Sequence, residues 1–202
     1  MRTPVNQVKA TLEPNDHPYR NGAWTPVFEE LDTGDLEVIG NIPDDIDGLY
    51  VRNTENPVHD SLGRYHPFDG DGTIRIKGGK ATYRNRFVRT AGFEAEQQEG
   101  GPLWPGLMGN PHDALRPGMT AHGSVKDSSS TDVVVHAGAI LSTFYLCGEG
   151  YRLDPETLAT LGPADWVPDH GISAHCKVDE ATGELLFFNY AIEKPHLQYG
   201  VV

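Results

Sequence analysis

Histidine is the residue type through which this chain is best equipped to do chemistry. Nine histidines are spread over the sequence, at His17, His59, His66, His112, His122, His136, His170, His175 and His196. No two of them are spaced as an H-x3-H pair on a helix, so a metal site built from them needs ligands from distant segments. The imidazole nitrogen suits iron, copper and zinc. His175 is distinguished by its setting between two turn signals, in the run Gly-Ile-Ser-Ala-His-Cys-Lys-Val-Asp at 171–179.

Several common catalytic and binding motifs are missing from the sequence. It holds no HExxH, no GxxxxGK[ST] and no GxSxG motif. The run Phe-Asp-Gly-Asp-Gly at 68–72 is only faintly similar to a calcium loop, because an EF-hand needs an acidic ligand twelfth from Asp69 and that position holds Lys80. The two cysteines, Cys147 and Cys176, form no CxxC pair and no disulfide framework, which favours a reducing compartment.

The charge balance of the chain is strongly acidic. Its 16 Lys and Arg against 29 Asp and Glu give a formal net charge of −13, which argues against binding to DNA or to an anionic membrane. The N-terminus is unlike a signal peptide, and the longest apolar stretch, around residues 133–141, is far shorter than the roughly 20 residues that span a bilayer. We therefore expect a cytoplasmic protein with no nucleic-acid partner and no transmembrane segment.

Glycine and proline interrupt the chain often, and this favours many short strands. The sequence holds 23 Gly and 15 Pro. The strongest local pattern is a hairpin in which residues 73–77 alternate apolar and polar, Gly78 and Gly79 form the turn, and residues 81–89 form the second strand. Further strands are expected at 48–52, 132–136, 140–146, 151–153 and 185–190, and a helical turn at 93–98. Short strands joined by tight turns indicate an all-β fold of antiparallel meanders, and a sandwich, a barrel and a propeller are all compatible with them.

Four stretches of the sequence resemble the carotenoid cleavage oxygenase superfamily in residue type, order and spacing. They are Gly-Leu-Tyr-Val-Arg-Asn at 48–53 with Asn-Pro at 56–57, Arg-Tyr-His-Pro-Phe-Asp-Gly-Asp-Gly at 64–72, Tyr-Arg-Asn-Arg-Phe-Val-Arg-Thr at 83–90, and Ser-Ala-His at 173–175 with Gly-Glu-Leu at 183–185 and Tyr-Gly-Val-Val at 199–202. The runs at 126–138 and 151–155 are most similar to the bacterial lignostilbene dioxygenase branch. The resemblance extends from about residue 24 to residue 202.

This resemblance implies a fold and a reaction. Members of the superfamily fold as a seven-bladed β-propeller and hold Fe(II) on its axis with four histidines and no haem. They split a C=C bond of a polyene or a stilbene with O2 and release two carbonyl products. The resemblance therefore implies Fe(II) as the cofactor, and an apolar alkene (a carotenoid, an apocarotenoid or a stilbene) and O2 as the reactants.

His175, in Ser-Ala-His, matches the first iron ligand of that family. The other three ligands belong to later blades, and family members are more than twice as long as this chain. We therefore expect a partial seven-bladed β-propeller, with residues 1–26 as an N-terminal arm and residues 27–202 as an incomplete propeller domain of roughly the first three blades. The missing C-terminal blades are then an expected partner of this chain.

Two residues match positions that stilbene-cleaving members use at the substrate. Lys126 matches a lysine placed near the substrate phenol, and Phe93 falls near a tyrosine position but lacks the hydroxyl. A lysine there would stabilise a phenolate and so push electrons into the alkene, whereas the alternative for Lys126 is a solvated loop lysine. The phenylalanine keeps a carotenoid or apocarotenoid substrate open.

The sequence departs from the family pattern near the expected iron. Cys176 stands where the family usually has proline; next to His175 on a strand, its side chain is expected to point the other way, as a small buried residue. Leu146 occupies the position of a carboxylate that supports an iron-bound histidine in many members, and Glu149 lies three residues later. The alternative function is therefore a catalytically inactive, truncated propeller fragment without a complete metal site.

Overall fold

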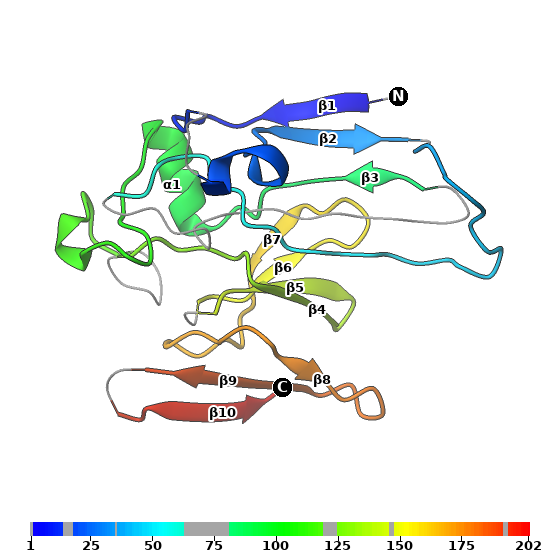
Figure 1. The fold of residues 1–202 in the computed structure, drawn as a ribbon. Coiled ribbons are helices and arrows are strands. Elements are labelled where there is room, and N and C mark those ends of the chain that lie inside the picture. Colours follow the sequence, from blue (N-terminus) through cyan, green and yellow to red (C-terminus); the bar gives the residue numbers. More distant parts are fainter. Residues whose placement is uncertain are drawn as a thin grey trace.

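The computed structural model shows the chain as a stack of short antiparallel sheets. The residues that it describes are 2–13, 18–34, 36–62, 81–118, 125–145, 148–191 and 194–202. These residues form ten strands in three sheets, one α-helix and three short 3-10 helices. In Figure 1 the N-terminal strands lie at the top and the C-terminal strands at the bottom. The expected mostly-β fold with antiparallel pairing is confirmed, and none of the described helices is long and apolar enough to cross a membrane.

The first sheet joins the start of the chain to a strand much later in the sequence. Its strands pair antiparallel in the order β1 (Arg2–Gln7), β2 (Glu29–Thr33) and β3 (Tyr83–Arg84). The register of β1 shifts between Pro4 and Asn6, where proline cannot donate a ladder hydrogen bond. Part of the segment that was expected to be an arm therefore forms a strand of this sheet. The 3-10 helices η1 (Pro18–Arg20) and η2 (Gly22–Trp24) lie between β1 and β2.

The middle sheet is a meander of four strands. In sheet order they are β4 (Asp132–His136), β5 (Ala139–Thr143), β6 (Tyr151–Leu153) and β7 (Thr160–Pro163). The turn between β4 and β5 consists of Ala137 and Gly138, whose φ angles of 47° and 77° are both positive. This is the backbone of the two-residue hairpin turn whose twist matches that of the flanking strands. The strands predicted in this region are confirmed, although β5 ends at Thr143.

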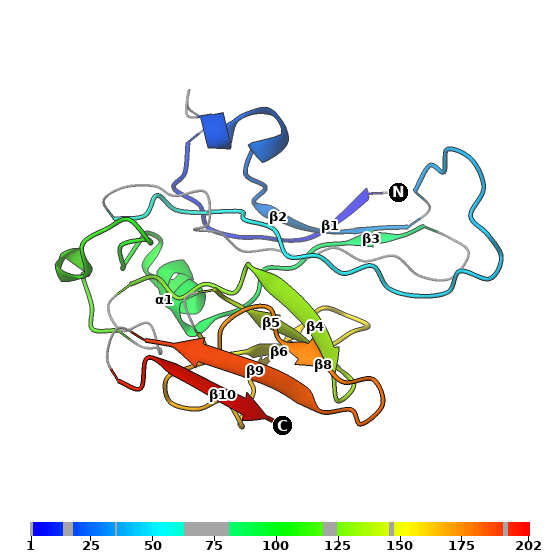
Figure 2. The ribbon, with the colours of Figure 1, turned by 60° about the horizontal axis from the view of Figure 1, so that its bottom comes forward.

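The third sheet contains the C-terminal strands. It has the order β10 (Leu197–Val201), β9 (Leu185–Tyr190) and β8 (Lys177–Val178). Leu185 and Val202 exchange two backbone hydrogen bonds of 2.8 and 3.0 Å, which close the end of the β9–β10 pair. Figure 2 shows this sheet in front of the middle one, so the two sheets face each other.

One helix, α1 (Ala91–Glu99), covers the side of the stack. The Thr90 hydroxyl accepts a hydrogen bond from the backbone N–H of Phe93, and Gly100, with a φ of 81°, ends the helix in the left-handed conformation. The side chain of Gln97 bonds both the N–H (2.7 Å) and the carbonyl (2.8 Å) of Lys9, which fastens the N-terminal segment to the helix. The helical turn predicted at 93–98 is thus confirmed. The short η3 (Pro111–Asp113) follows in the long connection.

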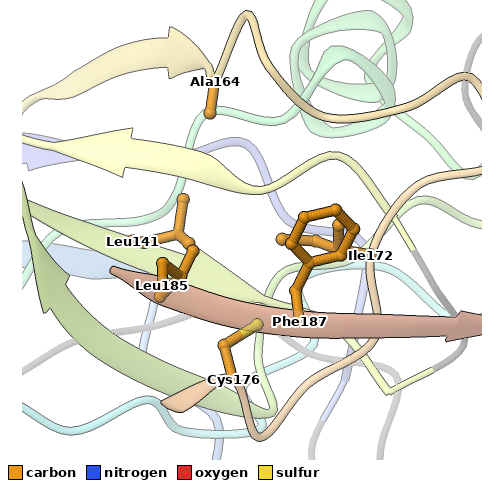
Figure 3. Close-up of a cluster of buried hydrophobic side chains, with 6 residues drawn as sticks. All are labelled: Leu141, Ala164, Ile172, Cys176, Leu185 and Phe187. Carbon is orange, nitrogen blue, oxygen red and sulfur yellow. The ribbon is translucent and has the colours of Figure 1, made fainter. Parts of the chain in front are cut away.

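The hydrophobic core lies between these layers as several separate clusters. The cluster drawn in Figure 3 consists of Leu141, Ala164, Ile172, Cys176, Leu185 and Phe187. Leu141 comes from β5 whereas Leu185 and Phe187 come from β9, so the middle and third sheets share one core. A second cluster, around Phe87 and Phe93, packs α1 against the N-terminal segment.

Two predicted strands differ from the structure. Residues 48–52 are in no strand, and Leu49 and Tyr50 are 37% and 58% exposed, so their apolar character does not reflect burial in the described part of the chain. The strand predicted at 81–89 is reduced to β3. Directly after β3, side-chain hydrogen bonds of Asn85 take the place of the backbone pairing with β2. The amide oxygen of Asn85 accepts from the N–H of Leu31 (2.7 Å), and its amide nitrogen donates to the carbonyl of Glu29 (2.8 Å). The other half of that predicted hairpin, at 73–80, lies outside the described residues.

Replacing Ile172 by alanine is expected to lower the free energy of unfolding by about 2–5 kcal/mol, because deleting buried methyl groups leaves a cavity. Ile172 is 0% exposed, whereas Leu161 on β7 is 52% exposed. Leu161→Ala is therefore the matched control, with an expected loss below about 0.5 kcal/mol. Urea unfolding followed by circular dichroism measures both variants. Equal unfolding midpoints for the two would contradict this placement of the core.

Candidate functional site

His175 lies in an irregular segment between the middle and third sheets. On its N-terminal side, Ile172 and Gly148 exchange two backbone hydrogen bonds of 2.9 and 3.0 Å, and the N–H of Ser173 donates to the carbonyl of Phe188 in β9 (2.8 Å). On its C-terminal side, β8 begins at Lys177. The short segment that carries His175 is therefore fixed at both ends by sheet hydrogen bonds.

The backbone of His175 is left-handed, with a φ of 68°. This conformation is uncommon for a residue other than glycine and persists only where the surrounding structure enforces it. Its neighbours supply that enforcement, since Ala174 is 0% and Cys176 4% exposed. The side chain of His175 is 66% exposed, so the two buried neighbours turn the imidazole outward.

Cys176 points into the core while His175 points out, as the sequence predicts, but the cause differs from the one expected. Neither residue is in a strand, and the left-handed turn at His175 separates the two directions. Burial raises the pKa of the Cys176 thiol to about 11, and the negative charge of Asp132 adds to this. The thiol lies 3.5 Å from the carbonyl of Ser173. Cys176 therefore stays protonated at neutral pH and acts as core, not as a thiolate ligand.

A carboxylate lies beside the His175 ring. Oδ2 of Asp132 is 3.4 Å from Nδ1 of His175, and Asp132 is the first residue of β4. The other oxygen, Oδ1, accepts a hydrogen bond from the N–H of Val133 (2.9 Å). The structure thus pairs the predicted metal ligand with an acidic residue from the middle sheet that the sequence analysis did not single out.

Lys126 is a buried, ion-paired lysine. Its side chain is 5% exposed, and its Nζ lies 3.0 Å from Oε2 of Glu96, whose side chain is 1% exposed. The second oxygen of Glu96 accepts a hydrogen bond from the N–H of Leu103 (3.0 Å). Glu96 belongs to the buried face of α1, so the pair attaches residue 126 to that helix. The lysine charge therefore has an opposite charge beside it, as a buried ion requires.

Phe93 lies on the same helix and is part of the core. It is 0% exposed, and its ring stacks on Phe87 with 5.3 Å between the ring centroids. The guanidinium carbon of Arg89 lies 5.1 Å from the centre of the Phe93 ring. The structure therefore brings both predicted substrate-binding residues, Phe93 and Lys126, to α1. His175 lies on a different segment, beside β4 and β8.

A buried histidine lies near the Lys126–Glu96 pair, and nothing in the sequence singled it out. His59 is 1% exposed, and its Nδ1 is 2.9 Å from the hydroxyl of Thr11. Burial lowers the pKa of His59, and the positive charge of Lys126 lowers it further, while Glu96 acts in the opposite direction. His59 is therefore neutral at neutral pH. A single histidine in a polar loop carries no spacing signal by which the sequence could reveal it.

Asp127 is a buried carboxyl group that titrates near neutrality. The Tyr151 hydroxyl donates to its Oδ2 (3.1 Å) and accepts from the N–H of Ala91 (3.0 Å). Burial raises the pKa of Asp127 to about 7, and the negative charge of Glu149 contributes to the rise. The charge of Glu149 therefore acts on the buried carboxyl group of Asp127. In the sequence, Glu149 lies three residues after Leu146, the position of the carboxylate that supports an iron-bound histidine in many members of the resembled family.

A run of buried serines connects Asp127 with Asp132. The hydroxyl of Ser129 donates to that of Ser142 on β5 (2.8 Å). The side-chain amide of Asn53, from the motif at 48–53, donates to the carbonyls of Ser129 (3.2 Å) and Asp132 (3.0 Å). Residues 126–130 therefore form a buried polar segment that leads from Lys126 to the start of β4 at Asp132.

Among the residues that the structure describes, no three His, Cys, Asp or Glu side chains gather closely enough to hold a metal ion. His17, His66, His122 and Cys147 are outside the described residues. The predicted ligand His175 thus has an exposed ring and lies in no such cluster of the described residues.

Replacing Lys126 by methionine is expected to lower the free energy of unfolding by about 3–5 kcal/mol, because Glu96 is then left buried and unpaired. Arg116→Met is the matched control, since Arg116 pairs with Glu99 of the same helix and both side chains are 49% exposed. That pair should contribute about 0–1 kcal/mol. Adding Glu96→Leu to Lys126→Met should restore part of the loss in urea unfolding. Equal losses for the two single variants would contradict the buried ion pair.

Asp127 should make the folded state less stable as the pH rises. Because its pKa is raised from 3.8 to about 7, the folded protein keeps a proton that the unfolded chain releases, so this contribution is lost between about pH 4 and pH 7. The slope is at most about 1.4 kcal/mol per pH unit. Asp127→Asn mimics the protonated carboxyl group and should show a smaller loss between pH 5 and pH 8 in urea unfolding. An identical pH dependence of the two proteins would contradict the raised pKa.

Comparison with known proteins agrees with the geometry and the motifs. The family described as retinal pigment epithelial membrane protein, RPE65, matches residues 24–202. A carotenoid 9,10(9',10')-cleavage dioxygenase 1 of Phaseolus vulgaris is 35% identical, over 92% of this chain and 38% of its own length. An isoeugenol monooxygenase of Pseudomonas nitroreducens is 34% identical, over 96% and 41%. The crystal structure of Pseudomonas brassicacearum lignostilbene dioxygenase matches with a TM-score of 0.76 and 28% identity, over 89% of this chain and 38% of that one.

The chain spans about two fifths of the length of these relatives. The family match nevertheless covers most of this chain, including the segments that carry Phe93, Lys126 and His175. The family that the motifs predict is confirmed, and the chain belongs to the RPE65/carotenoid cleavage oxygenase family.

Proposed function

We propose that this chain is the N-terminal part of a non-haem Fe(II)-dependent dioxygenase that cleaves a C=C bond of a carotenoid, an apocarotenoid or a stilbene to two carbonyl products. The observation that best supports the proposal is the exposed ring of His175 on a fixed backbone. Its ring is 66% exposed at the matched Ser-Ala-His motif, on a left-handed backbone between two buried neighbours. The names of the relatives, a carotenoid dioxygenase and an isoeugenol monooxygenase, support an oxygenase.

The imidazole of His175 fits Fe(II) as one ligand. A neutral imidazole nitrogen is a good donor for iron, and strained backbone is frequent at functional residues. In this proposal the other ligands come from the later blades, in the part of the relatives that this chain does not match. Bound iron would supply the activation of O2. In this proposal the residues of this chain supply one ligand and form one end of the substrate site.

In the proposed protein, the three sheets are the first blades of a seven-bladed β-propeller. The succession of three antiparallel sheets along the chain supports this, as does the TM-score of 0.76 with lignostilbene dioxygenase. Residues 27–202 then form the incomplete propeller and residues 1–26 the N-terminal arm, which adds β1 to the first sheet. The remaining blades are the proposed partner of this chain.

The residues at α1 favour a substrate end that is not a phenolate. Phe93 has no hydroxyl group, and the Lys126 ammonium group faces the Glu96 carboxylate at 3.0 Å, so its charge is already matched. A carotenoid or apocarotenoid is therefore the first candidate substrate. A stilbene is the second, supported by the likeness to lignostilbene dioxygenase. Lys126 and Phe93 are the proposed substrate-binding residues in both cases.

The alternative function is a catalytically inactive, truncated propeller fragment. The outermost strand of the third sheet supports it, because Leu197 and Tyr199 of β10 are each 66% exposed. An outer strand with exposed apolar side chains is a site for pairing or aggregation when nothing covers it. This reading predicts the same fold with no iron bound and no cleavage.

We also propose a cytoplasmic location and no nucleic-acid partner. The net charge of −13 supports the second point, because DNA binding requires a surplus of cations. Cys176 is a free, buried thiol, which suits a reducing compartment.

The proposed reaction is tested with the protein expressed from its complete reading frame and reconstituted with Fe(II). Under 18O2 it should convert β-carotene, an apocarotenal or a hydroxystilbene to two carbonyl products that mass spectrometry detects. His175→Ala should lose bound iron and lower the rate by at least about 100-fold, since losing a ligand should cost no less than losing its hydrogen-bonded support. His170→Ala removes an exposed histidine nearby and should change neither quantity. The isolated 202-residue chain should bind iron weakly and cleave none of these substrates.

Two results would contradict this proposal in different ways. Full iron content in His175→Ala, or tight stoichiometric iron binding by the 202-residue chain alone, would contradict the ligand assignment. An iron-loaded protein that forms no pair of carbonyl products would contradict the reaction and favour the inactive fragment.

A further inference from the structure

The two nitrogens of the His175 ring are in different surroundings. Nδ1 lies 3.4 Å from the carboxylate Oδ2 of Asp132. In a neutral imidazole one nitrogen carries the proton and the other a lone pair, and the neighbour of one nitrogen decides which is which. A carboxylate accepts protons, so it favours the form with the proton on Nδ1. The lone pair is then on Nε2, the other ring nitrogen.

Asp132 is held in place independently of His175. Its Oδ1 accepts from the N–H of Val133 (2.9 Å), and its carbonyl accepts from the Asn53 amide (3.0 Å) and the Thr143 hydroxyl (3.3 Å). Asp132 also pairs with Thr143 in the β4–β5 ladder. The carboxylate therefore belongs to the rigid middle sheet and needs little further ordering when it meets the ring.

The backbone of His175 is fixed as well, on the other side of the contact. Its φ of 68° is enforced by the buried Ala174 and Cys176, and its carbonyl accepts a hydrogen bond from Nζ of Lys177 (3.2 Å). With the backbone fixed, rotation of the side chain is the main freedom left to the ring. A carboxylate within reach of Nδ1 restricts that rotation.

We propose that Asp132 is a positioning residue for His175: it selects the form with the proton on Nδ1 and restricts the ring, so that Nε2 is the metal-binding nitrogen. The identity of the metal rests on the proposed function, whereas the protonated nitrogen is a property of this chain alone. Carboxylates that orient metal-binding histidines in this way change metal affinity by about 10–100-fold when they are removed.

The direct test reads which His175 nitrogen carries the proton. The full chain is labelled with 15N-histidine, and long-range 1H–15N correlations are recorded at alkaline pH, with His175→Gln to assign the signals. The proton should be on Nδ1 in the wild type and move to Nε2, the form that a free histidine side chain prefers, in Asp132→Ala. Asp132→Asn should keep it on Nδ1, because the amide oxygen still accepts. Asp169→Ala removes an exposed acidic residue from the same connection and is the matched control, with no change expected.

Iron affinity gives a second reading, in the protein expressed from its complete reading frame. Asp132→Ala should weaken Fe(II) binding about 10–100-fold, and Asp132→Asn should weaken it less. A wild-type proton on Nε2, or no change in Asp132→Ala, overturns the inference even if His175→Ala loses iron. If Asp132→Ala does not fold, the wild type and Asp132→Asn decide by the same criterion. The two proposals can also fail separately. If the proton is on Nδ1 and leaves it in Asp132→Ala, but iron binding is unchanged in His175→Ala, the positioning role is supported and the proposed function is contradicted.

Discussion

The buried polar segment at residues 126–130 is the constraint on which most of the described structure depends. These residues are neither helix nor strand, yet each is at most 6% exposed. Buried polar groups need hydrogen-bond partners, and the surrounding layers supply them. The helix contributes Glu96, the middle sheet contributes Ser142 and Tyr151, and the segment between β2 and β3 contributes Asn53. Separating any of these layers would leave polar groups of the segment without partners, so the segment joins elements that share no common sheet.

The left-handed backbone at His175 is tolerated because the packing around it is strong enough to offset the strain. A residue in such a conformation costs on the order of 1–3 kcal/mol. Ile172 and Cys176, on either side of it, belong to the cluster in Figure 3, and burying one large aliphatic side chain contributes about 1.5–3 kcal/mol. The free energy gained by burying Ile172 and Cys176 therefore offsets the cost of the strained backbone. A change of the His175 backbone to a relaxed conformation would move these side chains out of the core. An exposed ring on a rigid backbone is the result.

Elements with a local cause could be predicted from the sequence, and those that depend on distant partners could not. The apolar and aromatic run Leu-Leu-Phe-Phe-Asn-Tyr indicates β9, and Thr90 and Gly100 delimit α1, because strand composition and helix caps are encoded within a few residues. Residues 48–52 contain a similar apolar run but are in no strand of the described chain, since composition does not specify a partner strand. The same limit applies to the site. Single positions such as His175 can be matched to a motif, whereas Asp132 becomes its neighbour only when β4 packs beside that segment.

The buried segment also connects the two parts of the proposed site, because it begins at Lys126 and Asp132 follows its last residue by two positions. The six residues from one to the other span at most about 21 Å when fully extended. This length limits the separation of the backbone at Lys126, which pairs with α1, from the backbone at Asp132, which lies beside His175. Glu96 matches the charge of Lys126 at the far end, so an uncharged substrate end is favoured there. In the proposed assignment the matched charge thus favours an uncharged, apolar substrate end, and this property comes from a segment whose buried polar groups fix it in place.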